Sequence, residues 1–330
     1  MRCLRVILSL LAIVLMSSCT HKDLCYDHDE HAPDTDFVLE LSFDCEWHYN
    51  IDTDADWEQN WSMLYGVEYE DLRPDEPEGV RVHVYNEDDQ TETIRNLTKE
   101  NATIHFNEEG HYDLLFYNND TEYIVFEGLE SFGSAHATTR GAGRSTMVNS
   151  PDMLFGAYVD SLTVARNDVP DTLKVTLKPL VYTYLLRFEV SEGAEFISNA
   201  GGVLTGVATG VNLYDGSTSS GEGNIGFNCD MKGEYGTQGL LRTFGIPDYP
   251  NPNYSKNNGD RERKHELYLE VGLTNGKVNT FKYDITDQML AQPQGGVIII
   301  KDIKVNEAVS GGAFDVGVSG WGDYIDVPLN

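Results

Sequence analysis

The sequence predicts an all-β protein built from two β-sandwich domains. Apolar residues alternate with polar ones along most of the chain, with the period of two that a half-buried strand requires. Turn-forming pairs such as Asp215-Gly216 and Asn275-Gly276 separate these runs, and the helical period is scarce. Many short strands with such turns favour a sandwich. At about 150 residues per domain, the length indicates two of them.

The predicted strands follow this alternation along the chain. The first strand is expected at 37–47 and the last at 325–329. Between them the same pattern predicts strands at 80–84, 112–116, 173–177, 182–190 and 267–273. Two helices are expected, at 54–64 and at 286–292.

Pro179 interrupts the pattern between two of these strands, so the domain junction is expected at about residue 178. The N-terminal sandwich would then cover 37–177 and the C-terminal sandwich 178–330. Residues 19–36 carry six acidic side chains against a single Lys22 and have no apolar period. We interpret them as a solvated acidic tether.

The first 18 residues have the three parts of an export signal: a basic start, an apolar run at 6–16 and two small serines. The run is shorter than the roughly 20 apolar residues that span a bilayer, so a cleaved signal is favoured over an anchor. The sequence Leu15-Met16-Ser17-Ser18-Cys19 resembles a bacterial lipobox, whose cysteine receives lipid on its sulfur and, after cleavage, on its amine. We therefore expect a signal peptide at 1–18 and lipidation of Cys19, which would hold the mature chain at a membrane. The alternative is an ordinary secretory signal with a chance cysteine.

The charge balance is strongly acidic. The chain has 54 Asp and Glu against 23 Lys and Arg, and its net charge is −31. Residues 1–18 contain two arginines and no acid, so the mature chain would carry −33. So few basic residues cannot readily form a patch for phosphates, which excludes nucleic acid as an expected partner.

Beside Cys19, the mature chain contains Cys25, Cys45 and Cys229. An odd number argues against a disulfide framework, although one bridge among them stays open as an alternative. Cys45 lies in phase with the apolar side of the first predicted strand, where a thiol behaves as a small buried hydrophobe.

No catalytic motif is present: the sequence has no metalloprotease helix, no nucleophile elbow, no phosphate loop and no Cys-x-x-Cys pair. The triplet Asp52, Asp54 and Asp56 begins like a calcium loop but lacks the Gly and the Glu that the loop requires. His28 and His31 lie among acids in the tether, with too few further ligands to define a metal site. We therefore predict a non-enzymatic protein with no cofactor and no metal.

Several segments carry a recognisable pattern. After the lipobox and tether come Phe43-Asp44, then 78–85 and 110–121 in the first half, and 204–211 and 312–321 in the second. These segments resemble the uncharacterised lipoprotein branch of the Bacteroides fimbrillin-like, fimbrial anchor-type superfamily. The resemblance covers nearly all of the mature chain except 48–72. It implies two tandem transthyretin-like, Greek-key sandwiches.

The resemblance also implies a function: a lipid-anchored, surface-exposed outer-membrane protein that serves as a fimbrial anchor or accessory subunit in cell adhesion and pilus assembly. Fimbrial subunits would join it by strand addition. Stalk subunits of related fimbriae are cleaved after an Arg or Lys near the first strand, which opens a groove for the next subunit. Here no Lys or Arg occurs between Asp23 and Leu72, and Arg73 is followed by Pro74, which hinders cleavage. We therefore expect the first strand to be retained.

Two tripeptides, 160–162 and 171–173, look like the O-glycosylation acceptor pattern of Bacteroides envelope proteins, which makes Ser161 and Thr172 candidate modification sites. The alternative function is a surface lipoprotein that captures a host or glycan ligand. Eighteen tyrosines and four tryptophans could supply rings that stack on sugars, although most lie in strand phase, where core burial is the other use.

Overall fold

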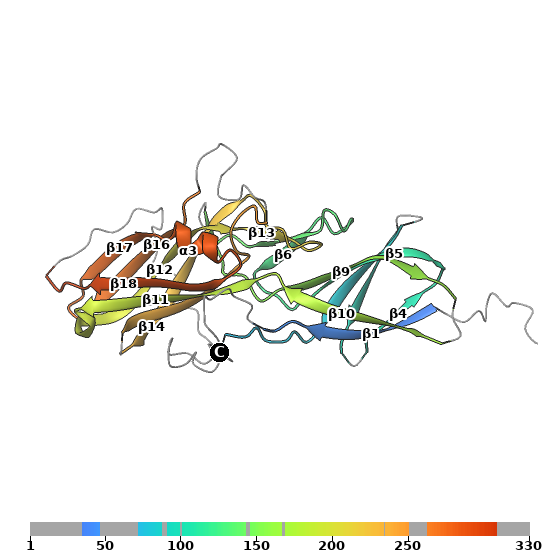
Figure 1. The fold of residues 1–330 in the computed structure, drawn as a ribbon, viewed down its shortest axis with the longest axis horizontal. Helices are drawn as coiled ribbons and strands as arrows, with labels where there is room; N and C mark the ends of the chain where they lie inside the picture. Colours follow the sequence, from blue (N-terminus) through green and yellow to red (C-terminus); the bar gives the residue numbers. More distant parts are fainter. Residues whose placement is uncertain are drawn as a thin grey trace, which may run out of the picture.

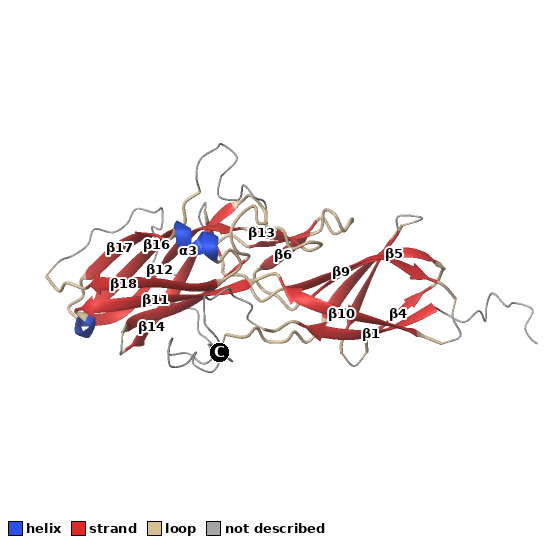
Figure 2. Ribbon diagram, viewed as in Figure 1, coloured by secondary structure: helices blue, strands red, loops and turns tan. Residues whose placement is uncertain are grey.

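The computed structural model describes residues 35–46, 72–87, 91–99, 101–142, 146–166, 169–233, 235–250 and 263–308. Strands dominate these residues, and helical structure is limited to the short 3-10 helix η2 (Ala194–Phe196) and to α3 (Thr286–Ala291) (Figure 2). The predicted all-β class is therefore confirmed. The predicted helix at 286–292 corresponds to α3.

The first large sheet has the strand order β3-β2-β5-β9-β10-β1-β4. Its strands are β1 (Thr35–Phe43), β2 (Val80–Asn86), β3 (Glu92–Leu97), β4 (Thr103–Phe106), β5 (Gly110–Tyr117), β9 (Phe155–Val164) and β10 (Asp171–Pro179). Their inward side chains form one hydrophobic core, in which Leu114, Phe116 and Phe155 are completely buried. Burial of these large apolar side chains is the main contribution to the stability of this sheet.

The second large sheet has the order β17-β16-β12-β14-β15-β11-β18, with β8 added beside β14. Its strands are β8 (Met147–Val148), β11 (Tyr182–Glu192), β12 (Ile197–Ala208), β14 (Glu222–Lys232), β15 (Gly236–Thr243), β16 (Glu266–Leu273), β17 (Val278–Asp284) and β18 (Gly296–Lys304). A second core, with Tyr184, Leu186 and Leu267 completely buried, fills it. The two large sheets form the two lobes of an elongated molecule (Figure 1).

A third, smaller sheet joins the two lobes. It consists of β6 (Ile124–Glu127), β7 (His136–Thr139) and β13 (Gly210–Asn212), so its strands come from both sides of residue 178. A third core lies beneath it, where Leu115 and Tyr117 of β5 pack with Val211 and Phe244 from the second half of the chain. The predicted boundary at about residue 178 lies near the end of β10, but β8 from the first half belongs to the second sheet and this shared core links the two halves.

Most of the predicted strands are found, with adjusted ends. The segments at 80–84, 112–116, 173–177, 182–190 and 267–273 lie within β2, β5, β10, β11 and β16. The first strand begins earlier and ends at Phe43, because the last backbone bond to β10 is the one from Asp44 N to Leu177 O, at 2.8 Å. The predicted helix at 54–64 and the predicted strand at 325–329 lie outside the described residues.

The shared core predicts that the two lobes lose stability together. Phe244 is completely buried there, so Phe244→Ala should lower the free energy of unfolding by about 3–5 kcal/mol. Amide hydrogen exchange should show the loss in β5 as well as in β15. Leu240→Ala is the matched control, because Leu240 on β15 is 45% exposed and its removal should cost only about 0.5 kcal/mol or less. Destabilisation confined to the second sheet would contradict a shared core.

Candidate functional site

The first strand is the candidate functional element, because it lies in the interior of its sheet. β1 runs parallel to β10 in a register from Phe37↔Asp171 to Phe43↔Leu177. Its other edge pairs antiparallel with β4, from Thr35↔Phe106 to Val38↔Thr103. Strands from opposite ends of the segment 35–177 therefore lie side by side in the sheet. Removing β1 would leave β4 without a neighbour and β10 without a partner along one edge.

The side chains of β1 explain why it occupies that place. Phe37 and Leu39 are buried in the first core, whereas Val38 between them is 42% exposed. The Phe37 ring packs edge-on against Phe106 of β4 at a centroid distance of 5.6 Å, and Phe43 packs in the same way against Phe155 at 5.5 Å. Such aromatic contacts add to the gain from area burial. The strand is therefore an integral part of the core.

Arg73 connects the chain just beyond β1 to the place where it returns. Its Nη2 donates to Glu46 Oε1 at 2.7 Å, and its Nε donates to the carbonyl of Cys45 at 3.4 Å. The preceding Leu72 is only 3% exposed. Because Glu46 and Arg73 flank residues 47–71, this contact holds the two ends of that segment together.

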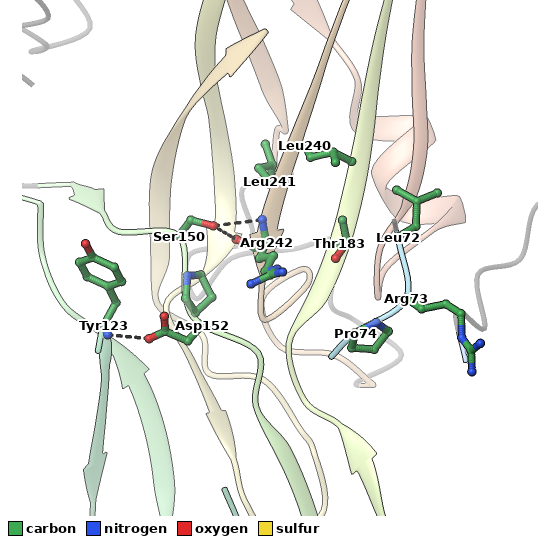
Figure 3. Close-up of a pocket in the computed structure, with 11 residues that line it drawn as sticks. Leu72, Arg73, Pro74, Tyr123, Ser150, Asp152, Thr183, Leu240, Leu241 and Arg242 are labelled. Atoms are coloured by element: carbon green, nitrogen blue, oxygen red, sulfur yellow. Dashed lines mark hydrogen bonds between the residues drawn. The ribbon is translucent and has the colours of Figure 1, made fainter. Parts of the chain in front are cut away.

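Leu72, Arg73 and Pro74 lie at the junction of the two lobes, with a cavity on each side. The larger cavity, of about 390 Å³, is lined by three separate segments, 72–74, 150–152 and 240–242, together with Tyr123 and Thr183 (Figure 3). The smaller one, of about 310 Å³, shares Pro74 and Thr183 and is bounded by Asp44, Glu46 and Lys178. Arg73 and Pro74 thus line the larger cavity, and Pro74 also lines the smaller one.

Polar groups of the larger cavity are mostly committed to the backbone. Asp152 accepts hydrogen bonds from the amides of Glu122 and Tyr123, both at 2.7 Å. Ser150 Oγ bonds to both the carbonyl and the amide of Arg242 at 3.0 Å. Arg242 also lines this cavity; it is exposed, and no described carboxylate lies within salt-bridge distance of its guanidinium.

The predicted site residues lie elsewhere. Cys19 is outside the described residues. Ser161 is exposed at the irregular part of β9, with a φ of 48°, and its amide donates to the buried carboxylate of Asp113 at 3.1 Å. Thr172 is exposed on β10, opposite Val38 of β1. Neither residue lines a junction cavity, and both hydroxyls stay candidate modification sites.

The remaining chemical groups are structural. Cys45 and Cys229 are free thiols, both partly buried. Burial raises the pKa of Cys229 to about 12 and also raises that of Cys45, so both stay as unreactive thiols at neutral pH. Within the part of the chain that the structure describes, no group of three His, Cys, Asp or Glu side chains could hold a metal. Cys25, His28, His31 and the Asp52 triplet lie outside it.

Sequence reasoning identified Arg73 and Pro74 but missed the rest of the junction. Its lining residues come from three segments separated by roughly 80 residues each, and each segment is an ordinary turn or strand end when considered alone. An arginine without a nearby acid in so acidic a sequence was the one available signal for Arg242.

Comparison with known proteins places this architecture. Residues 66–228 match a family model described as a domain of unknown function, DUF5119. The matched region begins just before Leu72 and ends within β14, so it includes all of the third sheet and the junction segments 72–74 and 150–152, but not 240–242. β1, α3 and β18 lie outside it.

The relatives carry fimbrial and adhesin names. A Bacteroides ovatus protein named as a candidate fimbrium anchoring subunit, Fim4B, is 27% identical over 138 residues, which is 40% of this chain and 41% of that protein. The match therefore spans about two fifths of each chain. A crystal structure of a candidate adhesin from Bacteroides ovatus superposes with a TM-score of 0.55 at 20% identity and covers 85% of this chain and 96% of its own. The fold is thus shared with that adhesin, and the predicted fimbrillin-like resemblance is confirmed.

The enclosure of β1 predicts a sharp contrast between neighbouring positions. Leu39→Ala should lower the free energy of unfolding by about 2–5 kcal/mol, because it opens a cavity in the first core. Val38→Ala on the same strand is the control and should cost about 1 kcal/mol or less, since that side chain is 42% exposed. Urea denaturation followed by circular dichroism measures both. Equal costs would show that β1 is not seated as described.

Proposed function

We propose that this protein is a non-enzymatic anchor or accessory subunit of a fimbrium, held at the outer membrane by lipid on Cys19 with its body exposed at the cell surface. The related candidate fimbrium anchoring subunit supports the role by sequence. The observation that carries the proposal is the enclosed β1, paired on both edges and buried on one face. A subunit that propagates a fibre gives up such a strand, whereas one that keeps it starts or ends the assembly.

Retention of β1 is favoured twice. Its loss would expose the edges of β10 and β4 together with the apolar groups that now contact Phe37 and Leu39, and such an edge is prone to aggregate. The Arg73–Pro74 bond is also protected from a trypsin-like protease, because Arg73 forms an ion pair with Glu46 and the adjacent Leu72 is buried. A trypsin-like protease needs an extended, accessible segment around its target. Arg73 followed by Pro74 at the junction does not offer one.

Partner subunits would join by strand addition at an edge that is still open. Among the described strands, β3 pairs only with β2, and its residues are exposed except Leu97. Its outer backbone groups are therefore available to an extended segment of another subunit. The positively charged Arg95 and the apolar Ile94, which is 49% exposed, would favour an apolar partner strand with acidic residues.

Membrane attachment is proposed to reside in Cys19 alone. Among the described residues, no helix is long and apolar enough to cross a membrane. The tether at 19–36 would carry the lobes away from the bilayer surface, and its acidic residues would keep it solvated.

A second function is favoured by the larger junction cavity. Arg242, Tyr123 and Thr183 all line this cavity, and the Arg242 guanidinium suits a small anionic ligand such as an acidic sugar. This would make the protein a surface lipoprotein that captures a glycan or host ligand. Binding of acidic glycans that depends on Arg242 would favour this function over assembly.

The lipid proposal predicts a single point of attachment. Cys19→Ala should release the protein from the membrane fraction and abolish labelling by a palmitate analogue, because several acyl chains are needed for stable anchoring. Cys25→Ala, six residues further along the tether, is the matched control and should remain membrane-bound and labelled. Membrane retention of the Cys19→Ala protein would refute attachment through this residue.

The anchor proposal predicts an uncut N-terminus. Mass analysis of the protein isolated from its native envelope should find the lipidated Cys19 peptide and an intact Arg73–Pro74 bond. In purified protein, brief trypsin treatment should leave that bond intact, whereas the double variant Glu46→Ala/Pro74→Ala should be cleaved at Arg73. Native protein that starts at or beyond Pro74 and lacks the lipidated peptide would favour a stalk subunit instead.

A further inference from the structure

The last described strand of the second sheet has an edge with an unusual composition. β18 pairs with β11 in a parallel register from Tyr184↔Gly296 onward, and it is the terminal strand of the sheet. Its central residues, Val297, Ile298, Ile299 and Ile300, are an uncharged β-branched run. A terminal strand of this kind is a ready template for another strand, and natural proteins block such edges.

Two glutamines of α3 occupy this edge. Gln288 and Gln292 lie four residues apart and so project from one face of the helical turn. Gln288 Oε1 accepts from the amide of Ile299 at 2.9 Å, and its Nε2 donates to the carbonyl of the same residue at 3.2 Å. Gln292 does the same to Val297, with distances of 2.7 and 2.9 Å.

These four hydrogen bonds reproduce what a neighbouring strand would supply. Alternate residues of a strand direct their amide and carbonyl groups to opposite sides, so Val297 and Ile299 face away from β11. A side-chain carboxamide has one acceptor and donors of the same kind as a peptide group. The two amides therefore satisfy the four backbone groups that the terminal strand would otherwise leave unpaired.

The helix is held firmly enough to serve this purpose. Met289 is completely buried in the second core, and the hydroxyl of Tyr184 donates to the carbonyl of Gln292 at 2.6 Å. Gly296 has a φ of 150°, and a Cβ there would overlap the Gln292 carboxamide, so the close approach depends on this glycine.

The rest of the edge is blocked differently. The β11–β18 register shifts after Ile300, and Asp302 has a φ of 59°. The flanking Lys301 and Lys304 are exposed, and Lys304 pairs with Glu192 at 2.5 Å. Irregular backbone and lysines are common means of preventing edge pairing. At the regular, uncharged half of β18, the hydrogen bonds to this edge from the described part of the chain come from the two glutamines.

We propose that α3 is a cap that closes the β18 edge to strand addition, and that the uncapped edge pairs with the same edge of a second copy of this chain. A second copy is the best partner because the Val297–Ile300 run supplies β-branched side chains to itself across a two-fold axis. The cap thus restricts strand addition to other edges of the molecule. This inference does not depend on the proposed fimbrial role.

The test removes the two carboxamides and keeps the helix. In the mature chain with Cys19→Ala, so that lipid does not contribute to association, Gln288→Ala/Gln292→Ala should accelerate hydrogen exchange of the Val297 and Ile299 amides by about 100-fold at low protein concentration. The Ile298 and Ile300 amides, which face β11, should keep their protection. Asp287→Ala, on the exposed side of the same helix, is the matched control and should change neither pair.

Association is the second readout. The double variant should form a concentration-dependent dimer in sedimentation velocity, with protection of Val297 and Ile299 restored as the dimer forms, whereas the parent and Asp287→Ala chains stay monomeric. The single variants should show exchange changes only at their own partner residue, which separates loss of the cap from unfolding. Unchanged exchange in the double variant would overturn the cap. Lost protection without a dimer, or a dimer in which these amides stay unprotected, would overturn the second copy as occupant.

Discussion

The constraint on which this structure depends is that the backbone groups of a strand need hydrogen-bond partners, from another strand or from side chains. Each unpaired strand presents a row of backbone donors and acceptors that costs free energy when buried and invites other chains when exposed. In the first sheet, β1 satisfies this requirement for two strands at once, because it pairs with β10 on one side and β4 on the other. In the second sheet, the amides of Gln288 and Gln292 do so for β18 without a further strand. The third sheet joins the lobes by pairing β7 with β13 from the other half of the chain.

The sequence was sufficient to locate strands that are buried on one face. β1 and β16 show the alternation clearly, and the structure has strands there. It was insufficient where both faces have the same environment: β18 is apolar on both faces, and β3 is exposed on both. His83 illustrates the same problem within a predicted strand. It occupies the polar phase of β2 yet is 1% exposed, bonded to Glu92 and to the hydroxyl of Tyr117 at 2.9 Å.

The junction could not be derived from the sequence for a different reason. Its residues are brought together by the pairing of strands far apart in the chain, and no local pattern encodes that pairing. The basic residues, scarce in this acidic chain, provide a partial guide. Arg263 is 3% exposed and forms ion pairs with Glu222 at 2.8 Å and with Asp248 at 2.6 Å. Arg73 forms an ion pair with Glu46 and so joins the two ends of residues 47–71. These two cations hold chain segments in place, whereas Arg242 lines a cavity without a carboxylate partner among the described residues, which makes it a candidate ligand contact.

The two ways of closing edges support the proposed role of a terminal subunit. A protein whose first strand stays in its sheet keeps its own groove filled, and therefore has no place at β1 for a strand from a second subunit. If the β18 edge were free, its uncharged run of β-branched residues would pair with other strands without specificity. The carboxamides of α3 prevent this at the cost of two side chains and one glycine. With both positions closed, strand addition is left to an edge such as β3, whose exposed and partly charged residues permit a specific, reversible partner. Under the proposed terminal role, the filled β1 position and the capped β18 edge each remove one place from which a chain of subunits could continue.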